Sequence, residues 1–172
     1  MIRILAVFFV CLISISAQDS GLQVSIGTEE VALGVEGLPW KLRVIAVTIT
    51  NPGDSPQSLV VGTYYNNADH WNVTANLMSR DGKITPLSRL PDHILVTGNV
   101  GPVVVRIPAH GSWRALLNAE NFEERIGNGS TNLAGIIGAS GDQLQIVVHC
   151  GMNIFPNTNS WKGDLVSGWL KI

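Results

Sequence analysis

Histidine, cysteine and methionine occur together in one short segment of the sequence, His149-Cys150-Gly151-Met152. Imidazole and soft sulfur ligands suit copper, so a copper-binding protein is one interpretation of this segment. His149 and Cys150 are neighbours in an expected β-strand, however, and neighbouring side chains of a strand point to opposite faces. We therefore predict no metal site and no cofactor: Cys150 is expected to be a buried small hydrophobe and His149 to face solvent.

Two Asp-His pairs, Asp69-His70 and Asp92-His93, carry the next candidate chemistry, because a carboxylate can orient an imidazole that acts as a general base. Residues adjacent in sequence are seldom placed to do this for each other, and both pairs lie in expected polar loops. Ser140, in the segment GASGD, does not form the Gly-x-Ser-x-Gly turn of a serine hydrolase. We predict no catalytic residue; a small secreted hydrolase that uses loop histidine and aspartate residues is the alternative.

Three tryptophans, Trp71, Trp113 and Trp161, lie near expected loops or strand starts. Exposed aromatic rings at such places can stack on sugars or anchor a protein partner. These three are the predicted binding residues. The competing interpretation is that they close the two ends of the hydrophobic core.

The elements that must position these residues are predicted to be β-strands. Gly, Pro and Asn recur about every ten residues, and the segments between them alternate between apolar and polar residues. In residues 143–150, for example, Leu144, Ile146, Val148 and Cys150 share one face. The expected strands are residues 22–26, 31–35, 43–50, 57–65, 72–79, 103–107, 112–119, 143–150 and 166–172.

Turn residues separate these strands. Strong turn signals are Asn51-Pro52-Gly53-Asp54 and the hairpin Arg80-Asp81-Gly82-Lys83. A helical turn is expected within residues 119–126. Long irregular loops are expected at residues 66–71, 89–92, 127–141 and 152–163.

Strands with one polar face pack on one side only, so two such sheets are expected to face each other across a core roughly 10 Å thick. The predicted fold is an all-β, immunoglobulin-like antiparallel β-sandwich of about nine strands. A closed barrel is the alternative architecture.

Four segments carry a family resemblance: residues 44–54 (VIAVTITNPGD), 76–82 (NLMSRDG), 107–113 (IPAHGSW) and 161–167 (WKGDLVS). Their order resembles that of immunoglobulin-like domains of secreted bacterial proteins. It is distantly similar to the intracellular proteinase inhibitor domain of Bacillus. The motifs consist mainly of residues typical of turns, so the resemblance implies a fold and assigns no functional residue.

The start of the chain has the pattern of a secretory signal peptide. Arg3 is the only charge before Asp19, and an apolar run over residues 4–13 ends in Ser14-Ile15-Ser16-Ala17. This run is shorter than the 20 or so apolar residues that span a bilayer, which disfavours a membrane anchor. We predict a signal peptide over residues 1–17, a single domain over residues 18–172, and a secreted or periplasmic location.

Charge excludes two classes of partner. The formal net charge is −2, and removal of the signal peptide makes it more negative, with no basic patch for nucleic acid. No polybasic amphipathic stretch favours a membrane surface in the mature form.

Asn72 and Asn128 begin glycosylation sequons, which would mark exposed asparagines in a eukaryote. The predicted function is a non-catalytic binding module for an extracellular or periplasmic protein or glycan.

Overall fold

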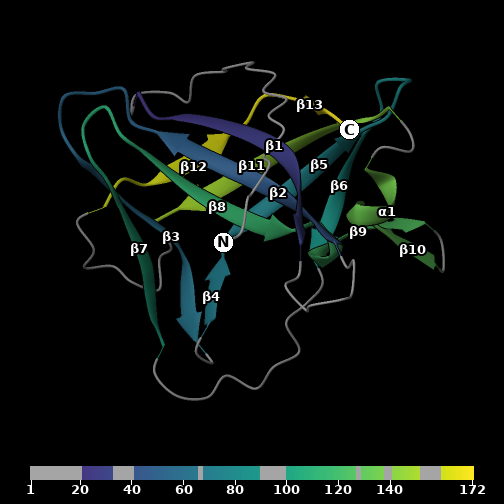
Figure 1. The fold of residues 1–172 in the computed structure, drawn as a ribbon, viewed down its shortest axis with the longest axis horizontal. Coiled ribbons are helices and arrows are strands. Elements are labelled where there is room, and N and C mark those ends of the chain that lie inside the picture. The colour runs from purple at the N-terminus through teal and green to yellow at the C-terminus, as the bar shows by residue number, and fades with distance from the viewer. Residues whose placement is uncertain are drawn as a thin grey trace.

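A computed structural model describes residues 21–32, 41–65, 68–89, 100–126, 129–137, 141–151 and 160–172. In these residues, thirteen strands form three antiparallel sheets, and helix is confined to two short turns (Figure 1). This confirms the all-β fold class. No helix in the described stretches is long and apolar enough to cross a membrane. The predicted signal peptide, residues 1–17, lies outside them.

The front sheet, so named for its place in Figure 1, has the order β1-β2-β8. Its strands are β1 (Gln23–Ala32), β2 (Lys41–Thr50) and β8 (Ser112–Asn118). Ile45, Val47 and Ile49 alternate along β2 and are buried in the core. The alternation read from the sequence is therefore the side-chain pattern of the central strand.

The back sheet has seven strands in the order β10-β9-β6-β5-β11-β12, with β13 also paired to β11. Its strands are β5 (Val73–Met78), β6 (Ile84–Arg89), β9 (Phe122–Ile126), β10 (Gly129–Asn132), β11 (Gln143–Cys150), β12 (Gly163–Val166) and β13 (Leu170–Lys171). Along β11 every second residue is buried, from Leu144 to Cys150. The strand predicted for residues 143–150 is therefore confirmed at both ends and in the face it buries.

The side sheet has the order β4-β3-β7 and extends away from the other two, toward the lower left of Figure 1. Its strands are β3 (Gln57–Tyr65), β4 (Ala68–Trp71) and β7 (Gly101–Ile107). Where β4 ends, the same edge of β3 bonds to the back sheet: Asn72 N donates to Val61 O at 2.8 Å and Gly151 N to Val60 O at 3.0 Å. Backbone hydrogen bonds thus fix the side sheet to the back sheet.

A single hydrophobic cluster joins the three sheets. It draws Ile45 and Val47 from the front sheet, Ile146 and Val148 from the back sheet, and Leu59 from the side sheet. Burial of such apolar side chains is the main favourable term in folding. The sheets therefore share one core.

Two turns, at residues 51–54 and 108–111, are tied together by one buried side chain, that of Asn51. Its Nδ2 donates to Ser55 O at 2.8 Å and to Pro108 O at 3.0 Å, and its Oδ1 accepts from Gly53 N at 3.1 Å. Its backbone N donates to Gly111 O at 2.9 Å. Asn51 satisfies carbonyls of both turns in a place that water scarcely reaches.

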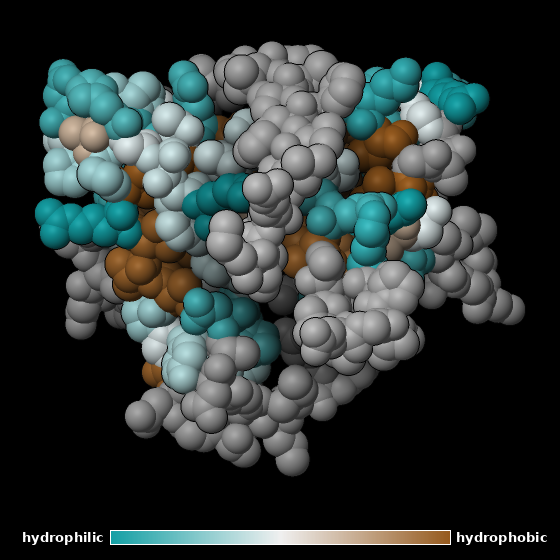
Figure 2. All heavy atoms as spheres, viewed as in Figure 1, coloured by the Kyte–Doolittle hydropathy of each residue, from teal (hydrophilic) through white to brown (hydrophobic). Residues whose placement is uncertain are grey.

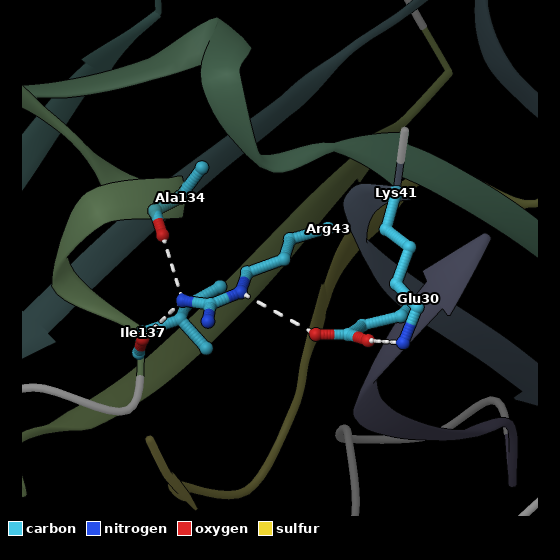
Figure 3. Close-up of polar contacts among 5 residues, drawn as sticks. All are labelled: Glu30, Lys41, Arg43, Ala134 and Ile137. Atoms are coloured by element: carbon cyan, nitrogen blue, oxygen red, sulfur yellow. Dashed lines mark hydrogen bonds and ion pairs between the residues drawn. The ribbon is translucent and has the colours of Figure 1, made fainter. Parts of the chain in front are cut away.

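The predicted helical turn is a 3-10 turn, η1 (Ala119–Asn121), followed by strand β9. A second short helix, α1 (Leu133–Ile136), lies in a segment expected to be irregular. Arg43 on β2 donates to Ala134 O at 3.1 Å and to Ile137 O at 2.6 Å at the end of α1 (Figure 3). This contact ties α1 to the front sheet.

Glu30 on β1 lies beside Arg43 and interacts with two basic residues of β2. Lys41 Nζ donates to Glu30 Oε2 at 2.9 Å, and Arg43 Nε lies 3.9 Å from Glu30 Oε1 (Figure 3). The hydrogen bond from Lys41, and then its positive charge, lower the pKa of the Glu30 carboxyl. Both groups are exposed, so this ion pair is a minor contribution to stability.

Several expectations differ from the structure. Residues 68–71, expected in a loop, form β4 on the edge of β3. In place of separate strands at 22–26 and 31–35, residues 23–32 form one continuous strand, β1, and residues 33–35 lie outside the described part of the chain. The structure has more than nine strands, because short strands such as β4 and β10 depend on pairing with a neighbouring strand, β3 and β9 respectively.

The strand expected at residues 166–172 is interrupted: β12 ends at Val166, and β13 covers only Leu170–Lys171. Leu165 and Ser167 are buried, whereas Val166 is only half-buried. Ser167 Oγ accepts from Ile146 N at 2.9 Å and donates to Gly168 O at 2.9 Å. The serine hydroxyl replaces a strand partner at the break between β12 and β13, so a polar residue occupies the core side.

Candidate functional site

Trp71 and Trp113, two of the predicted binding residues, are in contact. Trp71 ends β4 and Trp113 is the second residue of β8, and their ring centroids lie 4.9 Å apart at an interplanar angle of 43°. Both side chains are half-buried and pack against the core. The pair joins the side sheet to the front sheet.

Trp161, the third predicted binding residue, lies at the other end of the edge of β3. Its backbone N donates to Ser58 O at 2.9 Å, and it forms a parallel bridge with Leu59. Its ring packs closely over Gly163, at a distance that leaves no room for a Cβ there. It is half-buried against the core, like Trp71 and Trp113. The three tryptophans therefore lie where the side sheet meets the body of the molecule.

The side sheet carries a concentration of exposed apolar side chains. Among described residues, the exposed large hydrophobics are Tyr64, Ile84, Val100, Val104 and Leu116. Tyr64 lies on β3, Val104 lies on β7, and Val100 directly precedes β7 beside Gly101, the cross-strand partner of Tyr64. Figure 2 shows hydrophobic residues at the surface over β7 and β3, bordered by hydrophilic ones.

A hydroxyl, an imidazole and a carboxylate are aligned on the outer face of the back sheet. Thr74 Oγ1 lies 3.0 Å from His149 Nε2, and His149 Nδ1 lies 2.8 Å from Asp164 Oδ1. Thr74 and Asp164 are exposed, and His149 is partly exposed. This is the order of groups in a nucleophile–base–carboxylate triad.

Three adjacent strands position these groups. His149 on β11 is the direct cross-strand partner of Asp164 on β12. On the other side of β11, Val147 is opposite Thr74 on β5, which places His149 diagonally across from the threonine. Cross-strand and diagonal neighbours on one sheet face lie within side-chain reach. The alignment is a consequence of strand register.

Other polar side chains extend the same face. Asn76 Nδ2 donates to Gln145 Oε1 at 3.3 Å, and Gln145 Nε2 donates to Ser167 O at 3.2 Å. Asn72 Nδ2 donates to His149 O at 3.3 Å, while His149 N donates to Asn72 O at 2.9 Å. The sequon asparagine is therefore half-buried and bonded to β11. Asn128 lies outside the described residues.

Cys150 faces the core, on the side of β11 opposite to His149, as predicted. It is a free cysteine, and burial, reinforced by the negative charge of Asp164, raises the pKa of its thiol from 9.0 to about 12. A thiol held in its neutral form is a poor nucleophile and metal ligand. The described residues contain no group of three or more His, Cys, Asp or Glu side chains placed to hold a metal ion. Met152 lies outside them.

The other two described histidines, His70 and His110, have different partners. His70 lies on β4, where its ring stacks on that of Tyr65 with centroids 3.5 Å apart. His110 Nε2 lies 3.0 Å from Asp54 Oδ1 between the two turns joined by Asn51, and both side chains are exposed. Asp92, His93 and Ser140 lie outside the described residues.

Sequence reasoning placed His149 on the solvent face but missed Thr74 and Asp164 as its partners. The outward position of Thr74 was readable from alternation in residues 72–79, whereas its pairing with β11 was not. In comparisons with known proteins, no family model, no curated protein and no solved structure matches the chain.

Proposed function

We propose that this chain is an exported recognition protein whose residues 18–172 form an immunoglobulin-like β-sandwich that binds an extracellular or periplasmic protein through the side sheet. The export step rests on the signal-peptide pattern of residues 1–17. The sandwich architecture is supported by antiparallel sheets that share one core.

The observation that carries the recognition role is the apolar surface of the side sheet. Three of the five exposed large hydrophobics in the described part of the chain, Tyr64, Val100 and Val104, lie on this sheet or adjoin it. Apolar side chains that share one exposed face mark interaction sites. Val104 lies on the outer face of β7, whereas Tyr64 is paired with Gly101 and so shares the opposite face with buried Val103; the outer face of β7 therefore carries the argument. The outer face of β7 in the side sheet is the preferred docking surface.

The chemistry of these side chains favours a protein over a glycan. Sugars are held by aromatic stacking combined with hydrogen bonds, and the aliphatic side chains of Val100 and Val104 offer neither. A protein partner can bury valines in an apolar contact. Trp71, Trp113 and Trp161 would then stiffen the base of this sheet.

Two matched substitutions test the docking surface. Val104 on β7 and Ile84 on β6 are 53% and 54% exposed, so Val104→Arg and Ile84→Arg introduce the same charge at equally open strand positions. We expect a partner captured from the exported fraction of the source organism by the wild-type chain to be lost with Val104→Arg and retained with Ile84→Arg. Equal recovery with both variants, or no partner of the wild-type chain, would contradict the proposal.

A separate experiment tests export. We expect the protein collected outside the cytoplasm to begin at Gln18, as measured by intact mass. A protein that retains residues 1–17, or that stays in the cytoplasm, would refute cleavage and export without bearing on the docking surface.

A further inference from the structure

We propose that Thr74, His149 and Asp164 form an acyl-transfer centre in which the Thr74 hydroxyl is the nucleophile. This activity is independent of recognition by the side sheet, because the three residues lie on the outer face of the back sheet. The order hydroxyl–imidazole–carboxylate is the property that distinguishes this cluster from an ordinary polar surface.

The two distances set the roles. A threonine hydroxyl is a weak nucleophile unless a base accepts its proton, and His149 Nε2 lies 3.0 Å from Thr74 Oγ1, within the reach required of a general base. Asp164 Oδ1, 2.8 Å from His149 Nδ1, accepts the proton on that nitrogen and so selects the tautomer with a free Nε2 lone pair. Asp164 is therefore a positioning residue for the base.

The reaction needs only an ester and water as reactants. Thr74 Oγ1 bonds to the ester carbonyl carbon while its proton passes to His149 Nε2, and the bond from that carbon to the alkoxide breaks as His149 returns the proton to the leaving oxygen. Water then attacks the acyl-threonine with His149 again taking and returning a proton. The products are an acid, an alcohol and the original threonine.

Asn72 is the candidate donor to the negative oxygen that develops on the carbonyl. It lies two residues before Thr74, and its side-chain amide already reaches across the strand pair to His149 O at 3.3 Å. An amide of this kind can stabilise a developing oxyanion, and loss of one such donor typically slows a hydrolase about 100- to 1,000-fold.

The location of the centre limits its substrate class. Thr74 is exposed and lies within the strand-paired surface formed by β5, β11 and β12. An acyl group therefore reaches it directly from solvent. We expect small, activated esters to react, because their good leaving groups need little stabilisation by the protein.

The test uses p-nitrophenyl acetate and the full exported chain. We expect a burst of p-nitrophenolate with acetate attached to Thr74, located by mass spectrometry of peptides from acid-quenched protein. Thr74→Val removes the hydroxyl with little change of shape and should abolish the burst, while Thr74→Ser should retain it. Thr28→Val, at an exposed threonine on β1, is the matched control and should react like the wild type.

Substitution of the other two residues separates catalysis from structure. His149→Gln should lower the acylation rate by about 100-fold or more, the usual contribution of a general base. Asp164→Asn should lower it as well, and Asp164→Glu should restore part of the rate, since a carboxylate is kept. Rescue by glutamate is not expected if Asp164 only supports the fold.

Two results would overturn the proposal. One is acetylation of His149 or of lysines at a rate that Thr74→Val leaves unchanged. The other is the absence of a burst from wild-type protein whose urea unfolding is cooperative. Neither result affects the docking surface, which Val104→Arg tests on its own.

Discussion

At the scale of single residues, Asn51 shows how a buried polar group can specify a fold. Its side chain is almost fully buried, and it bonds to carbonyls that follow two different strands, at Ser55 and Pro108. Carbonyl groups left without a partner in such a place carry a large desolvation cost. The asparagine therefore fixes the mutual position of the two turns.

Replacement of this side chain should be strongly destabilising. We expect Asn51→Ala to lower the free energy of unfolding by about 2–4 kcal/mol, because several buried groups lose their partner at once. Asn76→Ala, which removes a single part-buried side-chain hydrogen bond to Gln145, should cost about 1 kcal/mol or less. Urea unfolding measures both; equal losses would show that Asn51 has no special role.

Cys150 gives a pH prediction at the same scale. Its pKa in the folded protein is about 12 against 9.0 for the ordinary thiol, chiefly because of burial. As pH rises the unfolded chain loses this proton first, so the stability contributed by the neutral thiol is present below about pH 9 and is lost between pH 9 and 12.

A comparison with Cys150→Ala isolates this effect from other groups that titrate in alkali. We expect the difference in unfolding free energy between the wild type and this variant to fall by up to about 1.4 kcal/mol per pH unit above pH 9. Urea unfolding at several pH values measures it. A difference that stays constant across this range would contradict a raised thiol pKa.

At the scale of elements, Gly62 permits β4 to pair with β3. It is opposite Trp71, beside a register shift in the pairing of β3 with β7. A Cβ at this position would run into the carbonyl oxygen of His70 and approach Trp71 Cα to 3.1 Å. These atoms belong to the backbone of β4, so they cannot move away without breaking the hydrogen bonds between β4 and β3.

Gly62→Ala should therefore displace β4, and we expect it to lower the unfolding free energy by about 2 kcal/mol or more. Gly27→Ala is the matched control on β1, where nothing lies within 4 Å of the added carbon. That variant should be neutral or stabilised by up to about 1 kcal/mol, because alanine restricts the unfolded chain. Thermal unfolding of the pair checks the contrast, and similar melting temperatures would refute the close approach.

At the scale of the whole molecule, the side sheet is held by two kinds of contact. The edge of β3 bonds successively to Trp161, Gly151 and Asn72, which belong to segments far apart in the sequence. The Trp71–Trp113 pair adds a side-chain contact to the front sheet. These contacts give the exposed apolar residues of the side sheet a rigid base.

A double-mutant cycle measures the second kind of contact. We expect Trp71→Leu and Trp113→Leu to be non-additive, with a coupling of about 0.5–1.5 kcal/mol, because aromatic pairs contribute this much beyond the area they bury. Trp161→Leu combined with Trp113→Leu serves as the comparison and should be close to additive. Additivity in the first cycle would mean that the ring contact does not couple the two sheets.

Local patterns predicted much of this architecture. The strands at 57–65 and 143–150 have the bounds read from the sequence, since alternation and flanking turn residues act within a few positions. The hairpin at residues 80–83 is present, with Gly82 at φ +84° as its turn requires. The short strand β4 was not predictable in this way, because it exists only by pairing with β3.

The candidate centre of Thr74, His149 and Asp164 was likewise predictable only in part. The sequence by itself determined that His149 and Cys150 point to opposite faces and that Thr74 points outward, because the side-chain period of a strand is fixed by local backbone geometry. Only the tertiary structure decided that Thr74, 75 residues away, and Asp164 meet His149. Their meeting depends on strand order and register, which are set by packing of all the sheets around one core.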